Sequence, residues 1–292
     1  MGFWKALFGS EEPTEGQEPR TQEDKQFDLF KYDGVKAVKM RQWEYAVKCF
    51  DEALKLRDDL EIHDHLATAL LQLGQYDESL RHLQLLADAE PQNVAILLQM
   101  SLVAYMKEDY VGMADFCQQA IAAGGENADA YYQMARAYSG QKNAVGAVAM
   151  LTKAIALRDD FADARLLRAQ TLLDMGDHAG AEEDAGRLLT DYPQQEDVLL
   201  LRARLSHAEG KADEAIAYYG RVIEANPFSL DAFRERGKVY FEQGRSREAE
   251  ADMRQVLELD PEQLDGVSGD YSAEGVEQYV RQAYANANPL GI

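Results

Sequence analysis

The stretch ADARLLRAQTLLDMGDHAGAEEDAGRLLTDYPQQ at residues 162–195 is followed by EDVLLLRARLSHAEGKADEAIAYYGRVIEANPFS at residues 196–229. Aligned without a gap, the two stretches match small residues, glycines and prolines in pairs: Ala169 with Ala203, Gly176 with Gly210, and Pro193 with Pro227. Each stretch contains two apolar patterns of helical spacing, separated by a glycine and closed by a proline. The chain therefore contains a repeated pair of helices with a period of 34 residues.

The same period extends over most of the chain. Small residues, which would let two helices approach closely, recur in the first helix of each unit: Gly34, Ala67, Ser101, Ala135, Ala169, Ala203 and Gly237. A second series falls in the second helix, with Met113 as its exception: Ala46, Ser79, Ala147, Ala181, Ala215 and Ala249. The two series predict seven units, at residues 27–59, 60–93, 94–127, 128–161, 162–195, 196–229 and 230–263.

Acidic residues mark the predicted helix starts. Four aspartates keep the same period: Asp129, Asp163, Asp197 and Asp231. Each stands just ahead of an apolar helical stretch, where a carboxylate can cap the free N–H groups of the first turn. We therefore expect each of these residues to cap a helix.

The pattern resembles the tetratricopeptide repeat (TPR) family. The sixth unit carries the family's small, glycine, alanine, aromatic and proline positions at Ala203, Gly210, Ala215, Tyr219 and Pro227. The second unit is also close, with Ala67, Gly74, Tyr76 and Pro91. The resemblance covers residues 27–263 and implies an all-α fold, a right-handed superhelical α-solenoid of seven helix pairs. Other residues replace glycine at three turns, Arg41, Glu108 and Lys142, which predicts that these turns are less tightly defined.

The two ends of the chain differ from the repeats. In the C-terminal part, residues 264–292, the segment 272–287 has helical spacing and is predicted to cap the last repeat. The N-terminal part, residues 1–26, is predicted to be an acidic linker preceded by an apolar arm made of Phe3, Trp4, Leu7 and Phe8. Three interpretations of the arm stay open: an inert end, a peptide that docks into the concave groove of its own or a second molecule, or a weak interfacial membrane contact.

Composition excludes several classes of partner. The formal net charge of -22 repels nucleic acid and anionic membranes. The chain has only two cysteines, Cys49 and Cys117, too far apart for a close metal-binding or redox pair. This cysteine usage favours a reducing, cytoplasmic setting. No stretch reaches the about 20 apolar residues that span a bilayer, so membrane attachment is not expected.

Motifs for catalysis, cofactors and metals are not found in the sequence. It contains no phosphate-binding glycine loop, nucleophile elbow or metalloprotease motif. His63 and His65 are the densest histidine pair, but a spacing of two residues points their rings to different sides of a helix. His63 shares the register of Leu97 and Tyr131, so we expect it to pack in the core. The predicted function is therefore not enzymatic.

An arginine series stands at positions where the family often has leucine: Arg168, Arg202 and Arg236. A role in ligand binding is one interpretation. We favour structural pairing with acidic neighbours such as Asp184 and Asp252, because a buried arginine is seldom unpaired.

The resemblance implies that the first helices of successive units line a concave groove. Positions four and then three residues apart share that face of each helix. The predicted groove residues are Leu98, Leu102, Tyr105, Tyr132, Arg136, Leu166, Gln170, Leu173, Leu200, Arg204, His207, Arg234, Lys238 and Phe241. The set has an apolar centre followed by cationic groups, which favours a ligand with apolar anchors and acidic groups.

The leading prediction is a cytoplasmic scaffold or adaptor that binds a peptide or protein segment in this groove. The alternative is a peripheral membrane or complex-assembly factor tethered through the apolar N-terminal arm. Neither prediction includes a cofactor.

Overall fold

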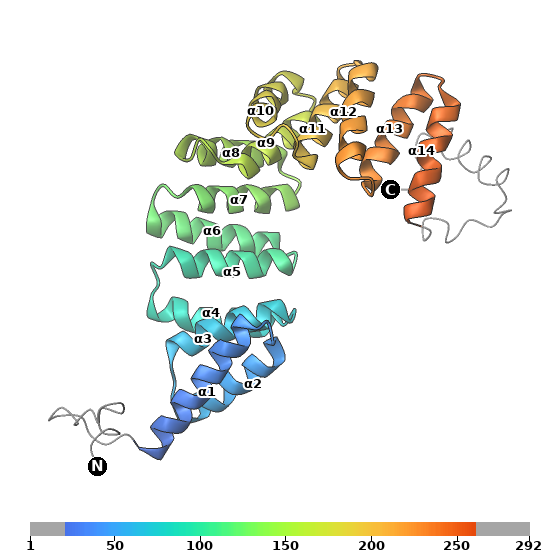
Figure 1. The fold of residues 1–292 in the computed structure, drawn as a ribbon. Helices are drawn as coiled ribbons and strands as arrows, with labels where there is room; N and C mark the ends of the chain where they lie inside the picture. The colour runs from blue at the N-terminus through green and yellow to red at the C-terminus, as the bar shows by residue number, and fades with distance from the viewer. Residues whose placement is uncertain (1–20, 261–292) are drawn as a thin grey trace, which may run out of the picture. The chain divides into compact units, whose positions relative to one another are not determined.

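The computed structural model describes residues 21–260, which form fourteen α-helices and no strand within that range (Figure 1). The helices are α1 (Gln22–Lys39), α2 (Trp43–Leu56), α3 (Leu60–Gln72), α4 (Tyr76–Ala89), α5 (Val94–Met106), α6 (Tyr110–Gly124), α7 (Ala128–Gly140), α8 (Ala144–Leu157), α9 (Ala162–Asp174), α10 (His178–Asp191), α11 (Glu196–Ala208), α12 (Ala212–Ala225), α13 (Leu230–Glu242) and α14 (Ser246–Leu259). The arm residues Phe3, Trp4, Leu7 and Phe8 and the predicted capping helix at 272–287 lie outside the described residues.

The chain divides into two compact units, residues 1–124 and 125–292. The first contains α1 to α6 and the second contains α7 to α14. Within each unit, the two helices of a repeat pack against one another, and the second packs against the first helix of the next repeat. From the second repeat onward, every first helix starts at the residue that the period predicts. The all-helical repeat fold predicted from the sequence is confirmed.

The first helix begins earlier than predicted. Residues 22–26, assigned to the linker from the sequence, form the first turn and more of α1. Thr21 caps this helix, because its hydroxyl accepts from Asp24 N while the Asp24 carboxylate accepts from Thr21 N. This reciprocal capping box fixes the start of α1 at Gln22.

The aspartate series has a different role from the predicted one. Asp129, Asp163, Asp197 and Asp231 each lie inside the first turn of α7, α9, α11 and α13. The N-cap of α7 is instead Asn127, whose side chain accepts from Ala130 N at 3.0 Å. The aspartates therefore favour these helix starts through their charge near the free N–H groups.

The turns inside the repeats are equally well defined whether or not they contain glycine. Gly74 and Gly176 have φ angles of 72° and 80°, and Glu108 and Lys142 both have 58°. The next residue donates to the helix in the same way in each case, as in Gln75 N to Leu70 O and Asn143 N to Tyr138 O. The prediction that the turns without glycine are less tightly defined is therefore wrong. Their helices force the same left-handed turn on residues that rarely adopt it.

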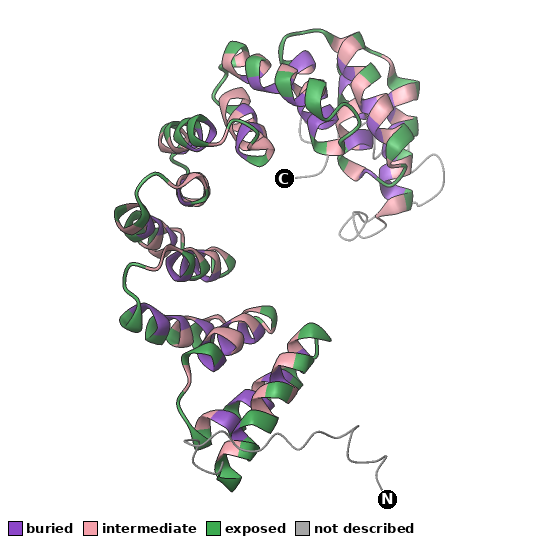
Figure 2. Ribbon diagram, turned by 60° about the vertical axis from the view of Figure 1, so that its left-hand side comes forward, coloured by how far each residue is buried: buried purple, intermediate pink, exposed green. Residues whose placement is uncertain are grey.

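Small residues allow the helices of each unit to pack closely. Figure 2 shows the buried residues on helix faces that turn towards neighbouring helices. The small residues of both series are almost all fully buried. At Gly34, an added Cβ would lie 2.4 Å from Cε1 of Phe50, so α1 and α2 could not approach as they do with any larger residue.

Candidate protein-binding site

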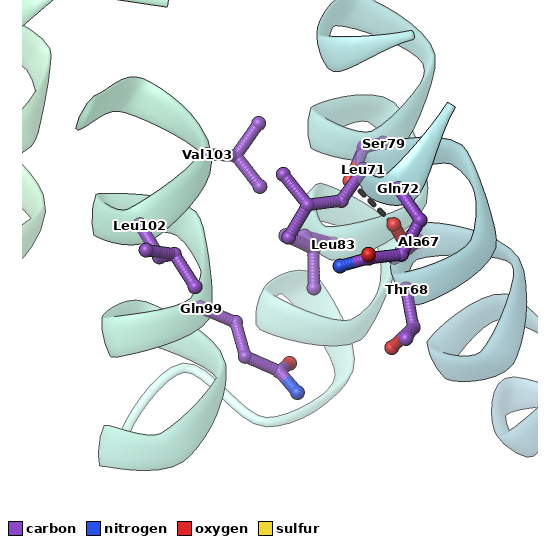
Figure 3. A pocket seen from close by; sticks show the side chains of 9 residues that line it. All are labelled: Ala67, Thr68, Leu71, Gln72, Ser79, Leu83, Gln99, Leu102 and Val103. Atoms are coloured by element: carbon purple, nitrogen blue, oxygen red, sulfur yellow. Dashed lines mark hydrogen bonds between the residues drawn. The ribbon is translucent and has the colours of Figure 1, made fainter. Parts of the chain in front are cut away.

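Three helices of the first unit, α3, α4 and α5, enclose a pocket of about 240 Å³. Its walls combine apolar and uncharged polar side chains: Ala67, Thr68, Leu71, Gln72, Ser79, Leu83, Gln99, Leu102 and Val103. In Figure 3, Gln99 on α5 points towards Thr68 on α3. The Ser79 hydroxyl donates to Ala67 O at 2.7 Å and so joins α4 to α3 behind the pocket.

The pocket coincides with part of the predicted groove. Leu102 lines it, while Leu98 and Tyr105 lie half-buried on the same helix. Thr68 and Leu71 stand one repeat before Leu102 and Tyr105 in the sequence. The period therefore already places Thr68 and Leu71 on the predicted groove face, one unit ahead of the predicted site residues.

Other pocket residues were missed because they lie on neighbouring faces. Gln72, Leu83, Gln99 and Val103 are outside the registers used for the prediction. Val103 and Leu83 are buried core residues whose edges reach the pocket. Gln99 is exposed, and its Nε2 lies 3.5 Å from Asp64 Oδ1. The repeat period alone cannot separate these pocket residues from ordinary core residues or from solvent-exposed residues.

In the second unit, the predicted groove residues of α7 form a small cluster. The Tyr132 ring lies 4.9 Å from that of Phe161, measured between centroids. The Arg136 guanidinium lies 5.9 Å from the centre of the Tyr132 ring and donates to Gln133 Oε1 at 3.0 Å. Both Tyr132 and Arg136 remain half-buried, so a ligand could still reach them.

Further along the second unit, Leu166, Gln170 and Leu173 on α9 are also half-buried. Leu200 differs, because it is only 6% exposed and packs with Ala203 and Tyr219 inside α11 and α12. Its assignment to the groove is corrected: Leu200 is a core residue. Leu200 lies on the face of α11 that the next repeat covers, where it packs in the same core cluster as Ala232 and Val239.

The predicted cationic end of the groove already has carboxylate partners. Arg204 donates to Glu235 from Nε at 2.8 Å and from Nη2 at 2.6 Å. The Tyr219 hydroxyl donates to the same carboxylate at 2.8 Å, and burial together with Glu235 raises the pKa of Tyr219. The hydrogen bond to Glu235 also raises the pKa of Arg204. An acidic ligand would therefore compete with Glu235 for Arg204.

Two other predicted groove residues, Arg234 and His207, also lie beside carboxylates. Arg234 Nη1 lies 3.2 Å from Asp231 Oδ1, and His207 Nε2 lies 2.6 Å from Glu242 Oε2. Lys238 is exposed and Phe241 is half-buried. The sequence could not show these pairings, because most of them join different repeats or different turns.

The arginine series has the predicted structural role. Arg168 donates to Asp184 at 2.7 and 2.8 Å, and Arg236 donates to Asp252 at 2.8 and 2.7 Å. Arg202 contacts Glu182 instead. Structural pairing is confirmed for all three arginines. A fourth, Arg165, was not predicted and also reaches Asp184, at 3.4 Å.

A pair of histidines joins α3 to α4 beside the pocket. Nδ1 of His63 lies 2.7 Å from Nδ1 of His82, and Nε2 of His63 lies 2.8 Å from Asp58 Oδ1. The ring centroids are 4.9 Å apart. This distance is about the sum of the 2.7 Å contact between the nitrogens and the radii of the two rings, so the rings meet edge to edge. His63 is buried, as predicted, but its partner was not foreseen.

Among residues 21–260, no three or more His, Cys, Asp or Glu side chains gather as metal ligands. None of the helices described here combines the length and apolar character needed to cross a membrane.

Two models of protein families match the repeats of this chain. One family model described as tetratricopeptide repeat matches residues 65–131 and 200–263, and a second with the same description matches residues 139–205. These matches cover both units and follow the period derived from the sequence.

Solved structures show the same fold at low sequence identity. A tetratricopeptide repeat protein from Parabacteroides merdae has a TM-score of 0.69 and 16% identity, covering 90% of this chain and 100% of that one. The C-terminal part of a TPR repeat-containing protein from Cytophaga hutchinsonii has a TM-score of 0.63 and 19% identity, covering 82% and 99%. PilW, a type IV pilus biogenesis factor, has a TM-score of 0.63 and 17% identity, covering 76% and 98%.

Proposed function

Because the chain belongs to the tetratricopeptide repeat family, whose repeats generally mediate protein–protein interaction, we propose that it is a non-catalytic scaffold that binds a segment of a partner protein. The pocket between α3, α4 and α5 carries this proposal. An apolar side chain of the partner enters it, and the segment continues over Leu98 and Tyr105 on α5.

The pocket has the size and lining that a single side chain needs. Its volume of about 240 Å³ is below the roughly 300–1,000 Å³ of clefts that hold whole small-molecule ligands. Leu71, Leu83 and Leu102 supply an apolar floor, whose burial gives affinity. Thr68, Gln72 and Gln99 supply uncharged donors and acceptors at the edge, which suit the peptide groups of an extended segment.

Ligand charge is a secondary feature of this proposal. The acidic part of the predicted ligand has less support than the apolar part, because Arg204 and Arg234 already face carboxylates. Among the predicted groove residues of the second unit, Lys238 is the exposed cation. The two free cysteines, both buried, support the proposed cytoplasmic setting.

Selection of peptides from a displayed library on the full chain tests the proposal. We expect enriched peptides to share one large apolar residue. Gln99→Trp, which fills the pocket from its edge, should weaken their binding at least tenfold, about 1.4 kcal/mol. Binding is measured by fluorescence polarisation with labelled peptides.

Gln118→Trp is the matched control, because Gln118 is an exposed glutamine on α6 and does not line the pocket. Peptides that bind both variants as they bind the original chain would show that the pocket is not the site. A selection that enriches no peptide on the full chain would contradict the proposal as well.

A further inference from the structure

A stripe of four residues along α1, ending at its C-cap Met40, stands out from the rest of the surface. Leu29, Asp33, Lys36 and Met40 follow one another at intervals of four, three and four residues, so they share one helix face. Leu29 and Met40, at the two ends of the stripe, are each 56% exposed. A large apolar residue this exposed at both ends of one face points to a surface that another molecule covers.

The same face is the packing face of every later repeat. The positions that correspond to Leu29 are all buried: Ile62, Ile96, Ala130, Ala164, Val198 and Ala232. In the second repeat, Ile62, Leu66 and Ala69 form this stripe and belong to one core cluster with Phe50 of the first repeat. The stripe on α1 therefore has the position of a repeat–repeat contact, with no preceding helix among the described residues to cover it.

The centre of the stripe on α1 is charged. Where the second repeat has the buried residues Leu66 and Ala69, α1 has Asp33 and Lys36. An apolar partner would leave both charges buried without partners, which costs several kcal/mol. The partner of this face must therefore offer a cation opposite Asp33 and an anion opposite Lys36.

The stripe itself has that arrangement when it is reversed. Read from Leu29 it runs apolar, negative, positive, apolar, and read from Met40 it runs apolar, positive, negative, apolar. If two copies of α1 lie antiparallel about a twofold axis, Leu29 of each copy faces Met40 of the other. Asp33 of each copy then faces Lys36 of the other, and a twofold contact repeats both interactions. A parallel arrangement would instead oppose like charges.

We propose that this face of α1 is the docking surface for a second copy of the chain, in an antiparallel twofold dimer. Tyr32 and Tyr45, which are 66% and 52% exposed, flank the stripe and extend the contact. One helix of 18 residues, about 27 Å long, gives an interface at the small end of the range for stable complexes. The dimer is therefore weak and depends on concentration. The surface lies apart from the proposed pocket and does not rest on the proposed function.

Exchange of the central charges tests the dimer and its orientation together. Asp33→Lys gives a chain with two cations in the stripe, and Lys36→Asp gives a chain with two anions. Each variant repels its own copy, so each alone should sediment as a monomer where the original chain associates. An equimolar mixture pairs cation with anion at both contacts and should associate at least as strongly as the original chain. Sedimentation equilibrium of the full chain over a range of concentrations measures this.

Lys153→Asp changes an exposed lysine on α8, outside α1 and α2, so it is the matched control and should leave the dimer unchanged. The altered residues are on the surface, and circular dichroism checks that all variants keep their helices. A monomer at every concentration of the original chain overturns the proposal, and is the expected result if the N-terminal arm covers the stripe. A dimer that neither single variant weakens, or variants that stay monomeric when mixed, also overturns it.

Discussion

At the scale of single residues, the contact position between the two helices of a repeat takes either apolar or polar pairs. The third and fourth repeats place Leu97 with Phe116 and Tyr131 with Met150 at this register, while the second and fifth place His63 with His82 and Arg165 with Asp184. The polar pairs are stable at a buried position because each group has a hydrogen-bonding partner. The third and fourth repeats thus show which apolar residues can replace the two polar pairs at this position.

The histidine pair predicts a loss of stability in acid. The pKa of His82 is lowered by burial, by His63 and by Arg81. Below the usual histidine pKa of about 6.5, the unfolded chain takes up a proton that folded His82 resists, so stability falls as the pH falls. The slope from one such group is at most about 1.4 kcal/mol per pH unit.

The double variant His63→Leu, His82→Phe copies the third repeat and should lose this part of the pH dependence. Urea denaturation at a series of pH values between about 7.5 and 5 measures the free energy of unfolding for both chains. Equal pH slopes for the variant and the original chain would show that His82 does not resist protonation.

The carboxylate of Asp184 predicts a large effect of one substitution. Asp184 is fully buried and accepts from both Arg165 and Arg168. Asp184→Ala leaves the largely buried Arg168 without its carboxylate, while Arg165 keeps Asp159 as a partner at 2.6 Å, and the change should cost about 3–5 kcal/mol of unfolding free energy. Asp191→Ala, on the exposed end of the same helix, should change it by less than about 0.5 kcal/mol. Similar midpoints in urea for both variants would contradict this account.

The fourth repeat supplies the rescue for that loss. Its residues at the three corresponding positions are Tyr131, Met134 and Met150. The triple variant Arg165→Tyr, Arg168→Met, Asp184→Met should therefore recover most of the stability, because apolar groups of similar size can replace a buried ionic cluster without loss.

At the scale of the helix pair, the shared turn geometry predicts opposite effects of two substitutions. Lys142 has a left-handed conformation that costs a non-glycine residue about 1–2 kcal/mol. Lys142→Gly removes this cost, and after allowance for the more flexible unfolded chain it should stabilise by about 0.5–1 kcal/mol. Gly176→Ala should destabilise by about 1 kcal/mol for the same reason. Thermal denaturation compares the two, and a lower Tm for Lys142→Gly would refute the argument.

The helix pairs could be predicted almost completely, because their signals are local and repeated. Close packing needs small residues at fixed positions, so the period alone places six first helices at their observed starts. The start of α1 was predicted too late because it depends on the capping box of Thr21 and Asp24, which lies before the first period. The turns without glycine were misjudged because packing of the two helices overrides the preference of one residue.

The candidate site could be predicted only in part. Leu102 was found because it follows the helical period, but Gln99 and Leu83 depend on how three helices meet. The partners of Arg204 and His63 were not visible, because Glu235 and His82 lie elsewhere in the sequence. A period indicates which face a residue occupies, and side-chain geometry across helices decides whether that residue is free to bind.

At the scale of the whole molecule, the acidic composition predicts that salt stabilises the fold. A net charge of -22 repels itself most when the chain is compact. Salt between about 0.01 and 0.15 M shortens the screening length from about 30 to 8 Å. It also weakens exposed ion pairs, but these contribute little. The Tm should therefore rise with sodium chloride over this range, and a steady fall would show that ion pairs outweigh the repulsion.

The histidine pair and the pocket share α3 and α4, since Ala67 and Leu83 line the pocket while His63 and His82 join the same two helices. A ligand that contacts both helices and prefers the arrangement in which His82 is neutral would couple its binding to the protonation of His82. Thermodynamic reciprocity then requires that acid weakens the affinity of such a ligand and that the bound ligand lowers the proton affinity of His82 by the same factor. Binding in mildly acidic buffer should accordingly be accompanied by proton release.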